Sequence, residues 1–345
     1  MGLSIKDIIS KKEIEIPNLK GKTLAVDAFN TLYQFLSTIR QHDGMPLMDE
    51  NKNITSHLSG IFYRNVSLLS EGIKLIYVFD GKPPALKAKI HKKRGLVRDE
   101  YKEKYELAKS SEDITLMRKY SSQLIRLEDD MIEESKELLT ALGIQVIQAP
   151  SEGESQAAYL AKKKEVYASA SQDYDSLLFG APLLIKNLTL ARKKKTFSGY
   201  VEVKPELIEL DKVLEELEIN LEQLICIGIL VGTDYNPKGI PRIGQKKALK
   251  YVKEYVTKEE IFDSLKEKID ELEPFDQFDP YEIYDLFAKA EVNDEEIKFP
   301  EINFAKIKEI LVTRHGFSEE RIDKQLEKLK KIEEDKKQGN LDKWF

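Results

Sequence analysis

The sequence has little of several features that would define other classes of protein. It contains a single cysteine, Cys226, which excludes an internal disulfide and makes a cytoplasmic or nuclear setting the default. No apolar stretch approaches the ~18 residues that a membrane-spanning helix requires, and no charged-then-apolar leader stands at the start. We therefore expect a folded protein without a membrane segment, in which Cys226 only packs.

An excess of basic residues is also missing. The net charge is −6, with 34% charged and 41% hydrophobic residues among 345. A uniformly basic surface is thereby excluded, so any nucleic-acid binding must use local patches. The length and the apolar content suffice for one large α/β domain or two smaller ones.

β-rich runs alternate with helical stretches in the first half of the chain. This order is typical of a mostly parallel central sheet that is flanked by helices. Gly143 is a natural terminator for the helix before it. The expected strands are residues 23–27, 74–80, 144–149 and 166–171, and the expected helices are residues 28–40, 55–72, 131–142 and a segment after Ser151.

A long insertion and a helical remainder complete the expected organisation. Residues 82–126 are polar, lysine-rich and too long for an ordinary connection, which is typical of a functional insertion. Beyond Val203 the sequence indicates almost only helix, with a turn-rich break at 232–244. We expect one domain over 1–334, followed by a flexible tail at 335–345. The domain comprises an N-terminal region (about 1–105), the insertion, an internal region (about 127–260) and a helical remainder.

Acidic residues follow four of the expected strands. Because the carboxyl ends of parallel strands lie along one edge of a sheet, these side chains should converge there. A further acid in the turn-rich break is a plausible addition. The set is Asp27, Asp80, Glu152, Glu154, Asp173, Asp175 and Asp234.

Converging carboxylates repel one another unless cations neutralise them. Oxygen ligands without His or Cys favour Mg²⁺ or Mn²⁺, and two such ions can promote hydrolysis of a phosphodiester. Each acid also has a structural interpretation: Asp27 and Asp80 as helix N-caps, and Glu154 as a capping-box partner of Ser151. Asp173 and Asp175 would share one face of an extended chain.

Three basic segments contain no acidic residue. Lys82 to Arg98 carries seven basic side chains beside Asp80, which indicates a phosphate-contact surface. Residues 238–253 place a glycine-bounded loop before a lysine-bearing helix, where backbone N–H groups can receive a phosphate. The third, Arg192 to Lys195, we interpret as a solvated hairpin tip.

These motifs together resemble the flap endonucleases of the xeroderma-pigmentosum-G (5′-nuclease) family, of the archaeal and eukaryotic type. The resemblance covers nearly the whole chain. It rests on MGLSIKDII, VDAFNTLYQFL, TSHLSGIFYR, VFDGKPPALK, APSEGESQAAYLA, YASASQDYDSLLFG, GTDYNPKGIPRIG and QGNLDKWF.

The resemblance implies roles for individual residues. The seven acids would bind metal, with Asp175 also counted as catalytic, and Lys87 and Arg94 would act on the scissile phosphate from a helical arch through which the 5′ strand passes. Tyr33 would stack on a base, and Gly2 would place its amine near the metals once Met1 is removed. The implied DNA-binding set is Gly2, Tyr33, Arg40, Arg64, Lys82, Lys87, Arg94, Gly239, Ile240, Arg242, Gly244, Lys246 and Lys247.

The resemblance also implies cofactors and partners. These are two Mg²⁺ ions, which Mn²⁺ can replace, and K⁺ at the helix-two-turn-helix of residues 239–247, although Arg242 stands where glycine is common. The partners are DNA with a 5′ flap and the sliding clamp PCNA, and the chain by itself is expected to be a monomer. An intracellular location is implied, in the cytoplasm or nucleoid of an archaeon or the nucleus of a eukaryote. The clamp-binding box is Gln338, Leu341, Trp344 and Phe345.

Three alternatives stay open from the residues alone. QDYDS contains the D-x-D-S pattern of haloacid-dehalogenase phosphatases, whose aspartyl-phosphate would appear as a covalent burst. A non-catalytic DNA-binding clamp partner would be expected to lack some of the acids. A general RNA-cutting nuclease would need neither the clamp box nor the hairpin loop.

Overall fold

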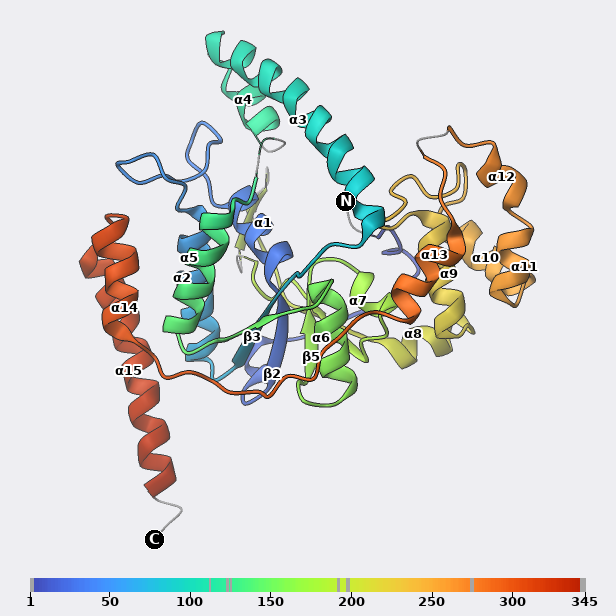
Figure 1. The fold of residues 1–345 in the computed structure, drawn as a ribbon. Coiled ribbons are helices and arrows are strands. Elements are labelled where there is room, and N and C mark those ends of the chain that lie inside the picture. Colours follow the sequence, from blue (N-terminus) through green and yellow to red (C-terminus); the bar gives the residue numbers. More distant parts are fainter. Residues whose placement is uncertain are drawn as a thin grey trace.

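The computed structural model describes residues 3–111, 113–121, 124, 126–190, 193–196, 199–273 and 276–341. A seven-stranded sheet lies at the centre, with strand order β1-β9-β6-β5-β2-β3-β4 (Figure 1). The neighbours from β4 to β6 are parallel, whereas β9 pairs antiparallel with β6 and β1. Its strands are β1 (Lys12–Glu13), β2 (Thr23–Asp27), β3 (Lys74–Phe79), β4 (Gln145–Gln148), β5 (Ala168–Ala170), β6 (Leu183–Lys186) and β9 (Glu206–Glu209).

The sheet is buried on both faces, as its apolar strands require. In β2, Leu24 and Val26 join the core on one face, while Ala25 joins the core on the other. Helices α1 (Ala28–Thr38), α2 (Ser56–Ser70) and α5 (Asp129–Ala141) contribute to the first core, together with α14 (Phe304–Lys308) and α15 (Glu319–Leu341). Helix α6 (Gly153–Lys162) covers the opposite face.

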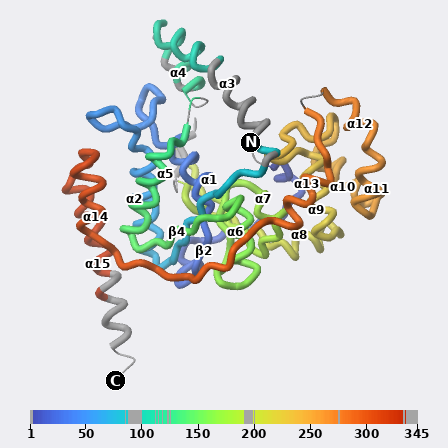
Figure 2. Tube along the Cα trace, viewed as in Figure 1, coloured from blue at the N-terminus to red at the C-terminus, as the bar shows by residue number. Residues whose placement is uncertain are grey.

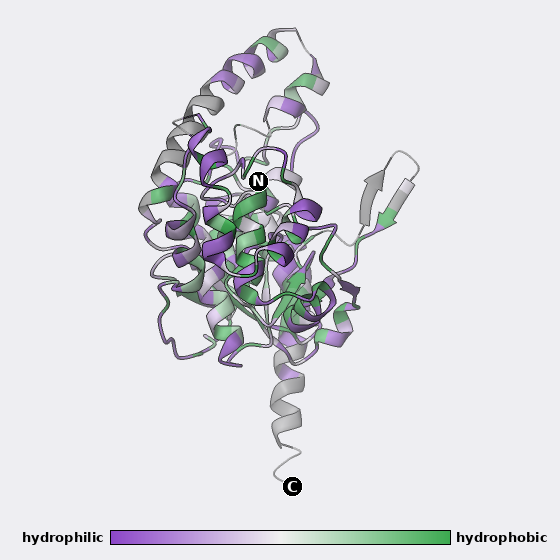
Figure 3. Cartoon of the chain, turned by 90° about the vertical axis from the view of Figure 1, so that its right-hand side faces the viewer, coloured by the Kyte–Doolittle hydropathy of each residue, from purple (hydrophilic) through white to green (hydrophobic). Residues whose placement is uncertain are grey.

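A second apolar cluster forms a lobe of short helices beside the sheet. Its buried side chains include Leu224 and Ile227 of the strongly apolar α9, and Cys226 is fully buried among them. The helices of this lobe are α7 (Asp175–Leu178), α8 (Leu210–Leu217), α9 (Leu221–Val231), α10 (Gln245–Glu254), α11 (Lys258–Asp263), α12 (Lys266–Asp270) and α13 (Pro280–Ala288). Figure 3 shows the apolar residues gathered around the centre of the molecule.

The expected insertion is a helical arch that stands above the sheet (Figure 1). Helix α3 (Ala85–Ser110) rises from the end of β3 and packs against α4 (Ile114–Ser121). Ser121, at the end of α4, donates a hydrogen bond to the carbonyl of Gly44 in the α1–α2 loop. The arch therefore begins close to Asp80 in sequence, and its other end is hydrogen-bonded to the α1–α2 loop.

An extended strap, residues 289–303, carries the chain from α13 back across the sheet to α14 (Figure 2). Gln156 holds it at Asn293, donating to the carbonyl and accepting from the N–H at 2.7 and 2.8 Å. Gln145 does the same for the carbonyl of Glu296 and the N–H of Lys298. The strap is neither helix nor strand, so these side-chain amides, together with the carbonyl of Ala141 that accepts from the N–H of Asn303, satisfy part of its backbone.

Most expected elements are confirmed, and the departures have physical reasons. The segment beyond Val203 is not almost entirely helical, because Glu206–Glu209 completes the sheet edge as β9 and the strap is extended. Lys193 to Lys195 lie in strand β7 (Lys193–Thr196), which pairs with β8 (Gly199–Glu202), rather than at a hairpin tip. Two short helices, Ile16–Leu19 (3₁₀) and Glu309–Arg314 (π), complete the structure. None of the described helices is long and apolar enough to cross a membrane.

Candidate metal centre and active site

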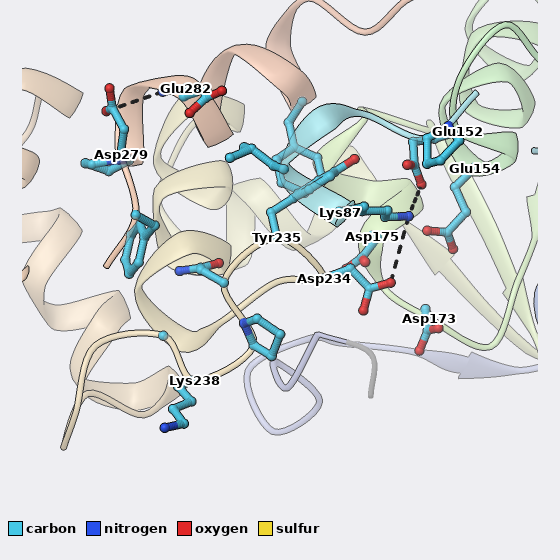
Figure 4. A pocket seen from close by; sticks show the side chains of 18 of the residues that line it. Lys87, Glu152, Glu154, Asp173, Asp175, Asp234, Tyr235, Lys238, Asp279 and Glu282 are labelled. Carbon is cyan, nitrogen blue, oxygen red and sulfur yellow. Dashed lines mark hydrogen bonds and ion pairs between the residues drawn. The ribbon is translucent and has the colours of Figure 1, made fainter. Parts of the chain in front are cut away.

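All seven predicted acids line one cavity of about 1760 Å³ at the carboxyl ends of the parallel strands. We call it the acidic cavity. It lies where β2 stands between β3 and β5, at the point where the strand order reverses, which is the usual ligand position in such sheets. Figure 4 shows Glu152, Glu154, Asp173, Asp175 and Asp234 around Lys87. The predicted convergence is therefore present.

Asp27 is the last residue of β2 and Asp80 follows β3, and both are fixed by backbone N–H groups. Asp27 caps α1 by accepting from the N–H of Asn30 at 3.1 Å, and it is only 6% exposed. Asp80 accepts from the N–H of Gly153 at 2.8 Å. Asp27 is therefore the N-cap of α1, as its structural interpretation predicts, and it also lines the acidic cavity.

Glu152 and Glu154 begin α6, but the expected capping box is wrong. The N-cap residue is Glu152, and its side chain makes no capping hydrogen bond. Glu154 instead accepts a hydrogen bond at 2.7 Å from the hydroxyl of Ser171, which follows β5. Because Glu154 is bonded across the sheet edge, its carboxylate points into the acidic cavity (Figure 4).

Asp173 and Asp175 lie in a turn and at the first position of α7, so the expected extended geometry does not apply. Asp173 accepts from the amide of Asn30 at 2.7 Å. Asp175 is 7% exposed, and its Oδ1 atom is buried without a hydrogen-bond partner among the residues that the structure describes. A buried, unpartnered carboxylate oxygen is costly, which suggests a ligand for it.

Lys87, from the first turns of the arch helix α3, supplies a cation to the acidic cavity. Its ammonium lies 2.5 Å from Glu152 and 3.9 Å from Asp234. Burial alone would lower the pKa of Lys87, but the charges of Glu152, Asp80 and Asp234 raise it above its ordinary value. Lys87 therefore stays protonated beside the carboxylates.

Burial and mutual repulsion disfavour the charged form of five acids of the cavity. Burial is the main cause that raises the pKa of Asp27, Glu154 and Asp175 well above the usual range, and neighbouring carboxylates add to it. The same causes raise the pKa of Asp173, and that of Asp80 to about 6. The site thus favours bound positive charge over seven free anions.

This repulsion predicts that Asp80→Asn stabilises the metal-free protein. Burial and the neighbouring carboxylates raise the pKa of Asp80 from an ordinary 3.8 to about 6 in the folded protein. Ionising Asp80 therefore lowers the free energy of unfolding increasingly as the pH rises from about 4 to about 6, and has no effect below that range. In EDTA at pH 7.5 we expect a gain on the order of 2 kcal/mol, which shrinks towards zero near pH 4. Thermal unfolding across this pH range measures it, with Asp263→Asn, an exposed acid, as the control. A gain independent of pH would contradict this explanation.

The implied DNA-binding residues differ in how accessible their side chains are. Tyr33 lines the acidic cavity and is 43% exposed, which leaves its ring accessible, and Lys82 is exposed nearby. Arg64 is half-buried on α2 and has an interaction partner. Arg40 donates from Nη1 to the carbonyl of Gly44 and the hydroxyl of Ser121, at 2.6 and 2.8 Å. In this structure Arg40 therefore ties the α1–α2 loop to the arch.

The helix-two-turn-helix comprises α9, the turns of residues 232–244, and α10. Arg242 has a φ of +67°, a left-handed conformation that glycine adopts more easily, which explains why glycine is common there. Ile240 is buried, and Gly244 precedes the first turn of α10 as its N-cap. Lys246 and Lys247 follow at this helix N-terminus, where Lys247 donates to the carbonyl of Arg242.

Several predicted residues lie outside the described part of the chain. Gly2, Trp344 and Phe345 are not described. Arg94 lies within α3, and Gln338 and Leu341 lie within α15, but their side chains are not described. Their roles stay predictions.

Three residues in or next to the acidic cavity were not singled out from the sequence. Asn30 and Ser171 hold Asp173 and Glu154, and Tyr235 is a buried phenol next to Asp234. Asn30 and Tyr235 stand inside the quoted motifs VDAFN and GTDYN, one turn or one residue away from an acid. Proximity to a predicted ligand is the signal that could have identified them.

Comparison with known proteins agrees with this geometry. The XPG N-terminal domain profile matches residues 1–101, and the XPG I-region profile matches residues 143–234. Flap endonuclease 1 of Thermococcus onnurineus is 51% identical over 100% of this chain and 99% of its own length, and that of Pyrococcus furiosus is 49% identical with the same coverage. The solved structure of flap endonuclease-1 from Methanococcus jannaschii superposes with a TM-score of 0.72 at 42% identity, covering 95% of this chain and 98% of that one.

A mostly parallel sheet with seven carboxylates in one cavity at the carboxyl ends of its parallel strands, in a chain matched along its whole length by nucleases, defines a hydrolase that cuts DNA. The chain belongs to the XPG nuclease family, and within that family to the flap endonucleases.

Proposed function

We propose that the chain cuts DNA at the base of 5′ flaps with two divalent ions held by the seven carboxylates of the acidic cavity. The observation that carries this proposal is the Oδ1 atom of Asp175, which is buried, has no hydrogen-bond partner and faces other acids. A cation satisfies that atom and offsets the repulsion at the same time.

The donor set suits a hard cation. The proposed ligands are all carboxylates, and the described residues that line the acidic cavity include neither His nor Cys, which favours Mg²⁺ or Mn²⁺. Among the described residues, no three acids are already close enough to hold one ion. Ion binding would therefore require side chains to turn inwards and Glu152 to give up its contact with Lys87.

The residues of the chain then have separate tasks. When bound, the ions would activate water and stabilise the leaving oxygen of the phosphodiester. Lys87, once released from Glu152, is positioned to neutralise charge on the scissile phosphate, and Arg94 on the same helix is proposed to assist it. Asn30 and Ser171 keep two of the carboxylates oriented through hydrogen bonds.

DNA would be held on both sides of the acidic cavity. We propose that the helix-two-turn-helix receives a phosphate of the duplex at the N-terminus of α10, with Lys246 and Lys247 adding charge, and that K⁺ binds at the same turns. Tyr33 offers an accessible ring on which a base can stack. Arg40 can contribute only after leaving Gly44 and Ser121, so its direct DNA contact is the least supported.

The biological role proposed is Okazaki-fragment maturation and DNA repair, with an associated 5′–3′ exonuclease activity and stimulation by the sliding clamp PCNA. Support comes from the flap endonuclease relatives and from the tail sequence Gln338, Leu341, Trp344 and Phe345. An aromatic pair at a polar terminus is suited to insertion into an apolar pocket of a partner.

Deleting residues 338–345 is expected to leave basal cleavage unchanged and to remove stimulation by the clamp. The described residues that line the acidic cavity all precede this segment, and the proposed chemistry is assigned to them alone. The measurement is the flap-cutting rate with and without clamp, in the full chain and in the truncated one. Stimulation that survives the deletion would contradict the assignment of the box.

A direct assay tests the proposed function. A labelled 5′-flap substrate is incubated with Mg²⁺ or EDTA beside matched duplex and single-stranded substrates. We expect cutting at the flap base only with Mg²⁺. Equal cutting of all three substrates, or cutting in EDTA, would overturn the proposal.

A further inference from the structure

The N-terminal end of α10 is tied to the N-terminal segment, residues 3–11, by two hydrogen bonds. Asp7 donates its backbone N–H to the side-chain oxygen of Gln245 at 2.9 Å, and the side-chain nitrogen of Gln245 donates to the carboxylate of Asp7. Gln245 is the first residue of α10. Both polar atoms of its amide are thus bound by one residue that lies 238 positions away in the chain.

The N-terminal segment is itself firmly attached on both sides of Asp7. Ile5 and Ile9 are buried in the apolar cluster of the helical lobe. Lys11 forms an ion pair with Glu206 of β9 at 2.7 Å, at the edge of the central sheet. The burial of the isoleucine side chains stabilises this arrangement more than the partly exposed ion pair does. Asp7 is therefore a fixed point to which a neighbouring element can be attached.

Different contacts hold the rest of α10. Ala248 and Val252 are buried in the same apolar cluster, and Gln223 of α9 donates from its side chain to the carbonyl of Val252 at 2.8 Å. The first turn of α10 is exposed or half-buried, and the side chain of its first residue, Gln245, is bound by Asp7. The middle and the end of the helix are thus fixed by burial, whereas the direction of its first turn depends on the contact with Asp7.

The first turn of α10 lies a short stretch of chain away from the acidic cavity. Residues 236–239, in the turns that precede α10, line that cavity. Successive phosphates of one DNA strand lie only ~3.4 Å apart along the helix axis. If a phosphate of the duplex is held at the first turn of α10, a shift of that turn by such a distance would bring a different phosphodiester to the carboxylates.

We propose that Asp7 and Gln245 are a positioning pair, which fixes the first turn of α10 relative to the acidic cavity and so sets the position of the cut. This inference rests on the proposed function, which places a phosphate of the duplex at that turn. Neither residue lines the acidic cavity, so the pair acts through the helix and not on the reacting atoms. The Asp7 carboxylate is favoured beside the first turn because the N-terminal end of a helix carries partial positive charge.

Breaking and then restoring the pair tests this role. Gln245→Glu removes the donated hydrogen bond and sets two carboxylates against each other. Adding Asp7→Asn restores the bond in the reverse direction, because the asparagine amide can donate to the new carboxylate. The matched control adds Asp7→Ala to Gln245→Glu, which gives the same net charge but no side-chain hydrogen bond. A second control, Glu218→Ala, removes the contact with Lys253 at the other end of α10.

Two quantities are measured on the full chain with a 5′ flap: the position of the cut, resolved to the nucleotide, and the single-turnover rate in Mg²⁺. We expect Gln245→Glu to raise the fraction of displaced cuts about fivefold and to lower the rate about tenfold, because a misplaced substrate reacts slowly. Adding Asp7→Asn should return both quantities to within about twofold of wild type, whereas adding Asp7→Ala should leave most of the defect. Glu218→Ala should match wild type.

The outcomes distinguish this inference from the proposed function. A wild-type protein that does not cut flaps in Mg²⁺ ends both. If wild type cuts, an unchanged cut position in Gln245→Glu overturns the positioning pair alone. Equal recovery with Asp7→Asn and with Asp7→Ala also overturns it, because charge and not the hydrogen bond would then be responsible. Should Gln245→Glu fail to fold, Asp7→Ala alone decides the question, with displaced cuts expected and a wild-type cut position contradicting the pair.

Discussion

Replacing Asp175 with alanine is expected to abolish cleavage of a 5′ flap, by ~10³-fold or more, while flap DNA still binds. Asp175 is buried at the start of α7, and its Oδ1 atom has no partner that could substitute for an ion. Its removal would leave an ion without one of its central ligands, but would not disturb the DNA-contacting loop before α10. Single-turnover cleavage in Mg²⁺ and flap binding in EDTA measure the two effects separately.

The variant should fold, because the substitution removes a carboxylate whose pKa is raised by burial and by Asp173 and Asp234. The control is Asp263→Ala, an exposed acid at the outer wall of the same cavity, which should cut at a rate close to wild type. Undiminished cutting by Asp175→Ala would count against the whole metal assignment. A loss of DNA binding in that variant would instead indicate a structural role.

The second large effect is expected for Lys87→Ala, a loss of about 10²- to 10³-fold in single-turnover cleavage. Lys87 is the arch side chain that reaches Glu152, and in the described part of the chain no other cation forms an ion pair with that carboxylate. Its alanine variant would lack the positive charge that is proposed to offset charge on the phosphate in the transition state. The effect should appear in the cleavage rate rather than in flap affinity.

Lys266→Ala is the matched control, because Lys266 lines the outer part of the same cavity and is exposed. It should leave the rate unchanged. A Lys87→Ala variant that cuts normally but binds flaps weakly would show that Lys87 only attracts DNA. That result would remove Lys87 from the chemistry without affecting the carboxylate assignment.

The strands and the main helices could be predicted because their signals are local. TLAVD ends as a strand at Asp27 where the sequence suggests it, and KLIYVF forms the neighbouring strand β3. A short run of consecutive apolar residues indicates a strand that is buried on both faces of a sheet, and it can be recognised without knowing which strands pair with it. The β9 strand and the strap were missed because the sheet edge and two distant glutamine side chains stabilise them, and local periodicity carries no such information.

The acids of the site were predictable for a different reason. Their positions after strands, combined with the rule that parallel strands end at one edge, place them together before any coordinates are known. Their precise partners were not predictable. The capping box of Ser151 with Glu154 fits the sequence, yet in the structure Glu154 bonds to Ser171 across the sheet edge.

The sequence alone determined the order of elements, the set of seven carboxylates and the membership suggested by its motifs, since these depend on residue type and spacing along the chain. Only the tertiary structure decided that Lys87 pairs with Glu152, that Arg40 is bound to the α1–α2 loop and the arch, and that the Lys87 ammonium lies over the ring of Tyr235. Such contacts join residues far apart in sequence, so they depend on the angles at which separate elements pack, and a one-dimensional pattern does not encode those angles.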